Sequence, residues 1–195
     1  MSITVKKGTV KTSAYSVAGA TLAEIWSDIQ KNGPKHKGAA RAGKTTCKIN
    51  MDSSSSKIEF TTTEGKKEFE AEAKMTKGAL SYDCTIEQPK LKSDAGLSAA
   101  AKKEWNRFMA ALVAHENEHV ADFGTVATEI GKEIDDLTAT GKGTDEKKAE
   151  KAALTEYTKV FQKTYSEAEN DKRLGASADA LDAGGHGPTL DTSIT

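Results

Sequence analysis

Apolar side chains recur every three or four residues through the second half of the chain, which predicts two long amphipathic helices. The first is expected to begin after an N-cap at Ser98 and to end at the glycines of the 140–143 stretch. The second opens with Asp145 and Glu146, whose charges favour a helix N-terminus. Two long helices joined by a short turn predict an antiparallel hairpin. The expected buried stripe of the first helix is Trp105, Phe108, Leu112, His115, His119, Phe123, Val126, Ile130, Ile134 and Leu137, and that of the second is Leu154, Tyr157, Phe161, Tyr165 and Ala168.

The first half has a different periodicity. Short extended stretches over residues 3–17 are followed by a helical pattern from Thr21 to Gln30, which Asn32-Gly33-Pro34 ends. Beyond it, apolar and polar residues alternate with a period of two in four segments, each typical of a strand with one wet face. These strands are expected near 47–51, 58–60, 69–75 and 80–86, with turns at 52–56, 64–66 and Lys77-Gly78.

Together these patterns predict an α+β fold, in which a short N-terminal helix and a four-stranded antiparallel meander pack on a long C-terminal helical hairpin. A chain of 195 residues is long enough for one domain with a real core. We expect that domain to span residues 1–173. Residues 174–195 are rich in Gly, Ala, Asp, Ser and Thr and have little to bury, which predicts a flexible C-terminal tail.

One motif on the predicted long helix carries chemistry. His115-Glu116-Asn117-Glu118-His119 reads His-Glu-x-x-His, the zinc-metallopeptidase signature. Residues four apart lie on one face of a helix, so both imidazoles can bind one Zn²⁺. Glu116 can then act as general base toward the water that the metal activates. The structural alternative is two core histidines that hydrogen-bond to carbonyls or carboxylates.

A catalytic zinc normally takes a third protein ligand. A third histidine six residues beyond the second is excluded because that position is Thr125. The predicted hairpin places residues 163–167 opposite the motif, with a few residues of slack. The candidates there are Asp171, which continues the buried stripe, then Glu167, then His186 of the tail. Tyr165 lies near the same place and is either a donor to a developing oxyanion or a core tyrosine.

Two cysteines, Cys47 and Cys84, leave three interpretations open: a disulfide, two buried thiols or ligands for a second metal. Both lie on the apolar faces of predicted strands. A disulfide therefore requires only that those two strands be neighbours, in an oxidising compartment.

Charge and hydropathy exclude several classes of partner. The net charge is −1, and no basic block with interleaved aromatic residues indicates a nucleic-acid surface. No run of eighteen apolar residues predicts a membrane span. The N-terminal residues 1–7 lack the apolar core of a secretory signal, so an export route is not evident.

Several motifs occur together in an order that resembles a bacterial family, first catalogued as a domain of unknown function and described as predicted secreted zinc-dependent proteases. They are Tyr15–Leu22, Asn32-Gly33-Pro34, Cys47 and Cys84, Pro89-Lys90-Leu91, Glu104-Trp105, His115-Glu116-x-x-His119 and a segment that starts at Tyr165. The resemblance extends to about residue 174 and implies zinc, peptidase activity and a secreted or periplasmic location. The family tends to have His-Gly six residues after the tyrosine, where this chain has Asp171-Lys172.

The sequence thus predicts a zinc-dependent metallopeptidase that hydrolyses a peptide or protein substrate, with His115, His119 and Asp171 on the metal and Glu116 and Tyr165 in catalysis. The alternative is a non-catalytic zinc-binding or protein-interaction module, including an inactive protease relic. Substrate identity and oligomeric state are not encoded in any pattern of this chain.

Overall fold

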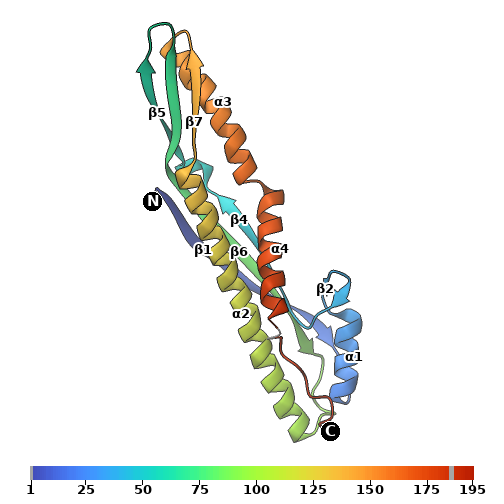
Figure 1. Cartoon of the computed structure of the whole chain (residues 1–195). Helices are drawn as coiled ribbons and strands as arrows, with labels where there is room; N and C mark the ends of the chain where they lie inside the picture. The colour runs from blue at the N-terminus through green and yellow to red at the C-terminus, as the bar shows by residue number, and fades with distance from the viewer. Residues whose placement is uncertain (1, 185–186) are drawn as a thin grey trace. The chain divides into compact units, whose positions relative to one another are not determined.

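The computed structural model describes residues 2–184 and 187–195, and the chain groups into two compact units. Unit 1 comprises Met1–Gly8, Lys48–Asp83 and Phe123–Gly175, and unit 2 comprises Thr9–Cys47, Cys84–Asp122 and Ala176–Thr195. The elements in chain order are β1 (Ile3–Val17), α1 (Leu22–Asn32), β2 (Lys35–His36), β3 (Ala39–Ala40), β4 (Lys44–Met51), a 3₁₀ turn (Ser53–Ser55), β5 (Lys57–Glu64), β6 (Phe69–Leu91), α2 (Ala99–Asp136), β7 (Thr138–Gly143), α3 (Glu146–Thr164) and α4 (Glu167–Ala183). Figure 1 labels all of them except β3 and the 3₁₀ turn.

The predicted mixture of helix and sheet is confirmed, but the sheet is not a four-stranded meander. β6 is a single strand of 23 residues that pairs with β1, β4, β5 and β7. Lys77-Gly78 does not turn the chain as predicted, because β6 continues through it. A Cβ on Gly78 would lie 2.7 Å from Ile3 Cδ1, so this glycine provides room for a core side chain.

The predicted helical hairpin is also absent from unit 1. α2 ends at Asp136, and the stretch expected to be a turn forms β7, which pairs antiparallel with β6. The glycines of β7 allow this strand to pack directly on α3 (Figure 1): a Cβ on Gly141 would lie 2.1 Å from Ala153 N, and one on Gly143 would lie 2.4 Å from Ala149 N. Close packing of β7 on α3 therefore requires glycine at these positions, and the glycines do not mark the end of a helix.

Unit 2 has its own hydrophobic core, formed by α1 and the first half of α2. The predicted short helix is confirmed as α1, and the Thr21 hydroxyl accepts from Glu24 N as its N-cap. Trp26 and Phe108 meet edge to face, with ring centroids 6.2 Å apart. The buried members of this core are Val17, Leu22, Ile25, Ile29, Leu97, Ala101, Trp105, Phe108, Leu112 and Leu190.

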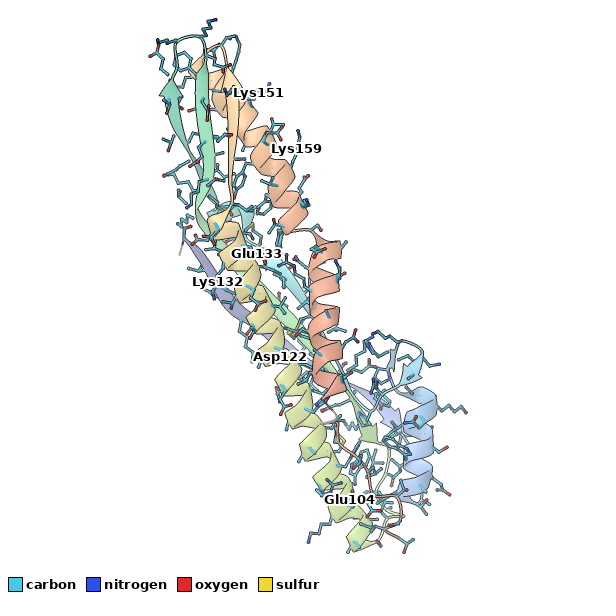
Figure 2. The ribbon with its side chains drawn as sticks, viewed as in Figure 1. Glu104, Asp122, Lys132, Glu133, Lys151 and Lys159 are labelled. Atoms are coloured by element: carbon cyan, nitrogen blue, oxygen red, sulfur yellow. A yellow bond between two sulfur atoms is a disulfide. The ribbon has the colours of Figure 1, made fainter. Side chains whose placement is uncertain are left out.

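The end of the chain differs from the flexible tail expected from residue 174. α4 continues to Ala183, and Leu190 is buried in the unit 2 core. Glu104 (labelled in Figure 2) accepts from Asp191 N, and Arg107 donates to Thr189 O. These contacts hold residues 187–195 against α2, because a few well-placed apolar and polar groups compensate for a composition that otherwise predicts disorder. No helix among the described residues is long and apolar enough to cross a membrane.

Of the three possibilities for the cysteines, the structure contains the disulfide. Cys47 on β4 and Cys84 on β6 are bonded, with Cα atoms 4.1 Å apart, and these two strands are neighbours in the sheet. The bond therefore joins two strands that are also joined by backbone pairing.

Breaking this disulfide should reduce the stability of the fold. The bond closes a loop with a sequence separation of 37 residues, so its loss should lower the free energy of unfolding by about 3–4 kcal/mol through the entropy of the unfolded chain. Urea unfolding of wild type and of the Cys47→Ser/Cys84→Ser double variant measures the difference. Equal midpoints for the two proteins would contradict the expectation.

The contribution of Glu104, which anchors the C-terminal segment, to the stability of the fold should depend on pH. Hydrogen bonds from the Arg107 guanidinium, followed by Asp191 N, lower the pKa of Glu104 from 4.5 to about 2. A carboxyl group with a lowered folded pKa stabilises fully above its unfolded pKa and loses that contribution as the pH falls toward the folded value. The urea midpoint of Glu104→Gln should therefore lie below that of wild type at pH 7, and the gap should narrow between pH 4.5 and pH 3. A gap that does not change with pH would contradict this account.

Candidate metal centre

His115 and His119 lie one turn apart on α2, in unit 2, and both are buried, with 8% and 5% of their surface exposed. Their rings meet edge to face, with centroids 4.8 Å apart. The spacing of four residues places both imidazoles on the inward side of the helix, as the apolar stripe predicts. Two buried polar rings require polar partners, and the structure supplies a carboxylate.

That carboxylate belongs to Asp182, near the C-terminus of α4. Its Oδ1 lies 3.4 Å from His115 Nε2 and 3.2 Å from His119 Nε2. The three ligand atoms all lie within 4.8 Å of one another. Ligands about 2.0–2.1 Å from a tetrahedral zinc are about 3.3 Å from each other, so both nitrogen–oxygen distances fit ligands that share one ion. This is the only such group of three among the residues that the structure describes.

Glu116 is held beside the two histidines by unit 2 segments that precede and begin β4. The Thr45 hydroxyl donates to Glu116 Oε2 at 2.7 Å. On the other side, a Cβ on Gly43 would lie 2.4 Å from Glu116 Oε1, so only glycine permits this close approach of the backbone. Glu116 is 3% exposed. Its carboxylate is thus fixed in one orientation.

Burial controls the protonation of the site. It raises the pKa of Glu116, and the hydrogen bond from Thr45 opposes that rise. It lowers the pKa of His119, and the neighbouring His115 lowers it further. A raised carboxyl pKa is suited to a general base, and a neutral imidazole is the form that binds a metal.

These groups line a cavity of about 260 Å³ in unit 2. One wall is the β2–β3 hairpin, whose His36 Nε2 lies 2.8 Å from Asp179 Oδ1 on α4. The guanidinium of Arg41, directly after the hairpin, lies 3.6 Å from Asp182 Oδ2. His36 is therefore part of the cavity wall. Gly187 and Pro188 of the C-terminal segment also line the cavity.

The structure brings Asp182, and not the predicted Asp171, to the imidazoles. Asp171 belongs to unit 1, where it lines a separate pocket with Lys48, Glu167 and Tyr165. Glu167 pairs with Lys48 at 2.9 Å, and the Tyr165 hydroxyl donates to Ile49 O at 3.2 Å. Neither is a member of the His-His-Asp group. The last candidate, His186, lies outside the described residues.

The register of the predicted hairpin explains why Asp171, and not Asp182, was expected beside the imidazoles. It assumed one short turn near residue 141, whereas β7 occupies that stretch and Tyr165-Ser166 separates α3 from α4. A signal for Asp182 did exist in the sequence, because Leu174, Ala178 and Asp182 follow one another at intervals of four. The composition of the tail concealed this helical pattern. Arg41, Gly43 and Thr45 carry no comparable local signal.

The fold and the site define an α+β protein in which two histidines of a His-Glu-x-x-His helix form a cluster with one carboxylate from another helix. Residues 12–172 match the family described as bacterial protein of unknown function (DUF922), and the chain belongs to that family. No curated protein matches the chain. No solved structure matches it either. Asp182 lies beyond the matched residues.

Removing the carboxylate of Asp182 should weaken zinc binding, because two imidazoles alone are a poor site. Zinc affinity, measured by competition with a chromophoric chelator, should fall at least about 10-fold in Asp182→Ala. Asp171→Ala is the matched control: it removes an α4 aspartate that lines the other pocket and should leave zinc affinity unchanged. The reverse pattern would restore the original assignment of Asp171.

Proposed function

We propose that this protein is a zinc-dependent metallopeptidase in which His115, His119 and Asp182 hold the ion and Glu116 is the general base. The observation that supports it best is the distance of Asp182 Oδ1 to the two imidazoles, 3.4 and 3.2 Å, which fits shared ligation of one ion. The next residue after the first ligand is a buried carboxylate in the same cavity. Ligands and base thus occur together, as hydrolysis by an activated water requires.

When bound, zinc supplies Lewis acidity, which brings the pKa of water to about 7 and polarises a carbonyl group. Glu116 would receive the proton of that water on its carboxylate and later deliver it to the leaving amine. Thr45 and Gly43 hold the carboxylate in position for both transfers. Because the orientation is set before substrate binds, little reorganisation is needed during the reaction.

The sheet offers a place for an extended peptide. β4 is the terminal strand on the path β1-β6-β4, so its outer edge can pair with a substrate main chain. Residues 42–45, which lead into and begin this strand, line the cavity. A peptide held along this edge would pass the metal centre. The Cys47–Cys84 disulfide supports a secreted or periplasmic location for this activity, since disulfides persist in oxidising compartments.

The second candidate is a non-catalytic protein in which the zinc is structural. It is favoured by the origin of the ligands, because two come from α2 and one from α4, so an ion would crosslink segments distant in sequence. Thermal melts with and without chelator separate the two functions. A large loss of stability on zinc removal favours a structural ion, whereas retained folding with lost turnover favours catalysis.

Replacing the general base should separate metal binding from hydrolysis. In Glu116→Gln the side chain keeps its size and the metal ligands remain, so zinc content should stay near one ion per chain. Cleavage of fluorescent casein should fall at least about 100-fold, the effect typical of removing a general base.

Zinc content by atomic absorption and the circular dichroism spectrum serve as controls for this comparison. Glu118→Gln is a matched variant on the same helix, since Glu118 is an exposed motif residue whose carboxylate is 4.0 Å from His115 Nδ1. It should retain most of the activity. Casein cleavage by Glu116→Gln at the wild-type rate would exclude the proposed mechanism.

A further inference from the structure

Arg41 is held beside the metal centre by contacts of its backbone and of the hairpin before it. Arg41 N donates to Pro34 O at 2.8 Å, which closes the base of the β2–β3 hairpin. His36 and Lys37 both reach Asp179, at 2.8 and 2.7 Å, and so fasten the hairpin to α4 one turn before Asp182. The backbone of Arg41 is therefore placed in advance at the edge of the cavity.

These contacts leave the N–H donors of the Arg41 guanidinium available. Its one ion pair, with Asp182 Oδ2, spans 3.6 Å, longer than a hydrogen bond. Within residues 2–184 and 187–195, the Arg41 side chain makes no hydrogen bond, and 48% of it is exposed. A guanidinium has five N–H donors in a planar fork that matches two oxygens at once.

The charge of the cavity wall indicates what this fork would bind. Apart from Glu116 and Asp182, the ionisable side chains that line the cavity are His36, Arg41, Lys44 and the two metal-binding histidines. Among the described residues no further acid lines the cavity, so the charged side chains of its wall other than the Glu116 and Asp182 carboxylates, Arg41 and Lys44, are positive. Such a wall favours an anionic oxygen, and a fixed donor near the reacting bond is the usual means of stabilising developing negative charge.

We propose that Arg41 binds an anionic oxygen of the substrate beside the metal centre. This inference rests on the proposed function. The oxygen has two possible sources: a carboxylate that the substrate carries throughout, or the scissile carbonyl oxygen as it gains charge during attack by water. In both cases the guanidinium N–H groups that are not directed at Asp182 donate to the substrate oxygen. Asp182 Oδ1 stays directed at the imidazoles.

The experiment compares zinc-loaded wild type, Arg41→Ala and the control Lys102→Ala, which removes an α2 cation paired with Asp94 and outside the cavity. Four pools of quenched fluorescent peptides are used, with or without acidic side chains and with free or amidated C-termini. Arg41→Ala should lose at least about 100-fold in kcat/KM, the typical cost of one oxyanion donor. Guanidinium chloride at millimolar concentration should restore part of the activity, and Lys102→Ala should match wild type.

The way in which the loss of activity is distributed over the four peptide pools identifies the source of the oxygen. A fall in kcat across all four pools assigns the scissile carbonyl, and a rise in KM confined to acidic or free-carboxylate pools assigns a substrate carboxylate; both support the proposal. Zinc affinity by chelator competition should stay within about 3-fold of wild type if Arg41 acts on the substrate. Loss of a residue that positions a metal ligand would lower the affinity by at least about 10-fold.

Three results would overturn the role of Arg41. Wild-type activity in Arg41→Ala excludes it directly. A fall in zinc affinity of 10-fold or more, with normal turnover once the site is loaded, would make Arg41 a positioning residue for Asp182 only. If zinc-loaded wild type cleaves none of the pools, the proposed function itself fails, and this inference falls with it.

Discussion

The burial of two imidazoles on one face of α2 is the constraint on which the arrangement of unit 2 depends. His115 and His119 occupy positions of a stripe that otherwise carries apolar core side chains, so each ring loses water and must regain a polar contact. Asp182 Oδ1 meets both Nε2 atoms at once. A single carboxylate near the end of α4 thus meets both buried rings and forms with them a His-His-Asp cluster that could hold a metal ion.

Several other features of unit 2 follow from the need to keep that carboxylate in place. The β2–β3 hairpin binds α4 through Asp179 and sets Arg41 beside Asp182. The C-terminal segment lines the cavity with Gly187 and Pro188 and is anchored on α2 through Glu104 and the buried Leu190. Glu116 is oriented separately, by Thr45 and by the space that Gly43 leaves. The His-His-Asp cluster and Glu116 are therefore positioned by different segments, so a mutation can disturb one without the other.

The residues that match the family model contain only part of the His-His-Asp cluster. The matched residues, 12–172, contain His115, Glu116 and His119 but not Asp182. The third member of the cluster therefore lies beyond the residues that match the family model. The predicted third ligand, Asp171, lies within the matched residues, and in this structure it lines another pocket. The chain thus has the motif, and the carboxylate that lies beside its two histidines comes from a later turn of α4.

Local spacing was sufficient to predict α1, the presence of both strands and helices, and a long helix that carries His115 and His119, because each depends on contacts between residues a few positions apart. The amphipathic stripe even indicated that both histidines point inward. Local rules failed where a residue has two uses: the glycines at 78, 141 and 143 resemble turns but provide room for packing. Only the tertiary structure decided which cysteine interpretation holds, which acid meets the imidazoles, and that Arg41, Gly43 and Thr45 surround them. Those choices depend on how segments more than 35 residues apart approach each other in space, for example Cys47 with Cys84, separated by 37 residues, and no short-range periodicity carries that information.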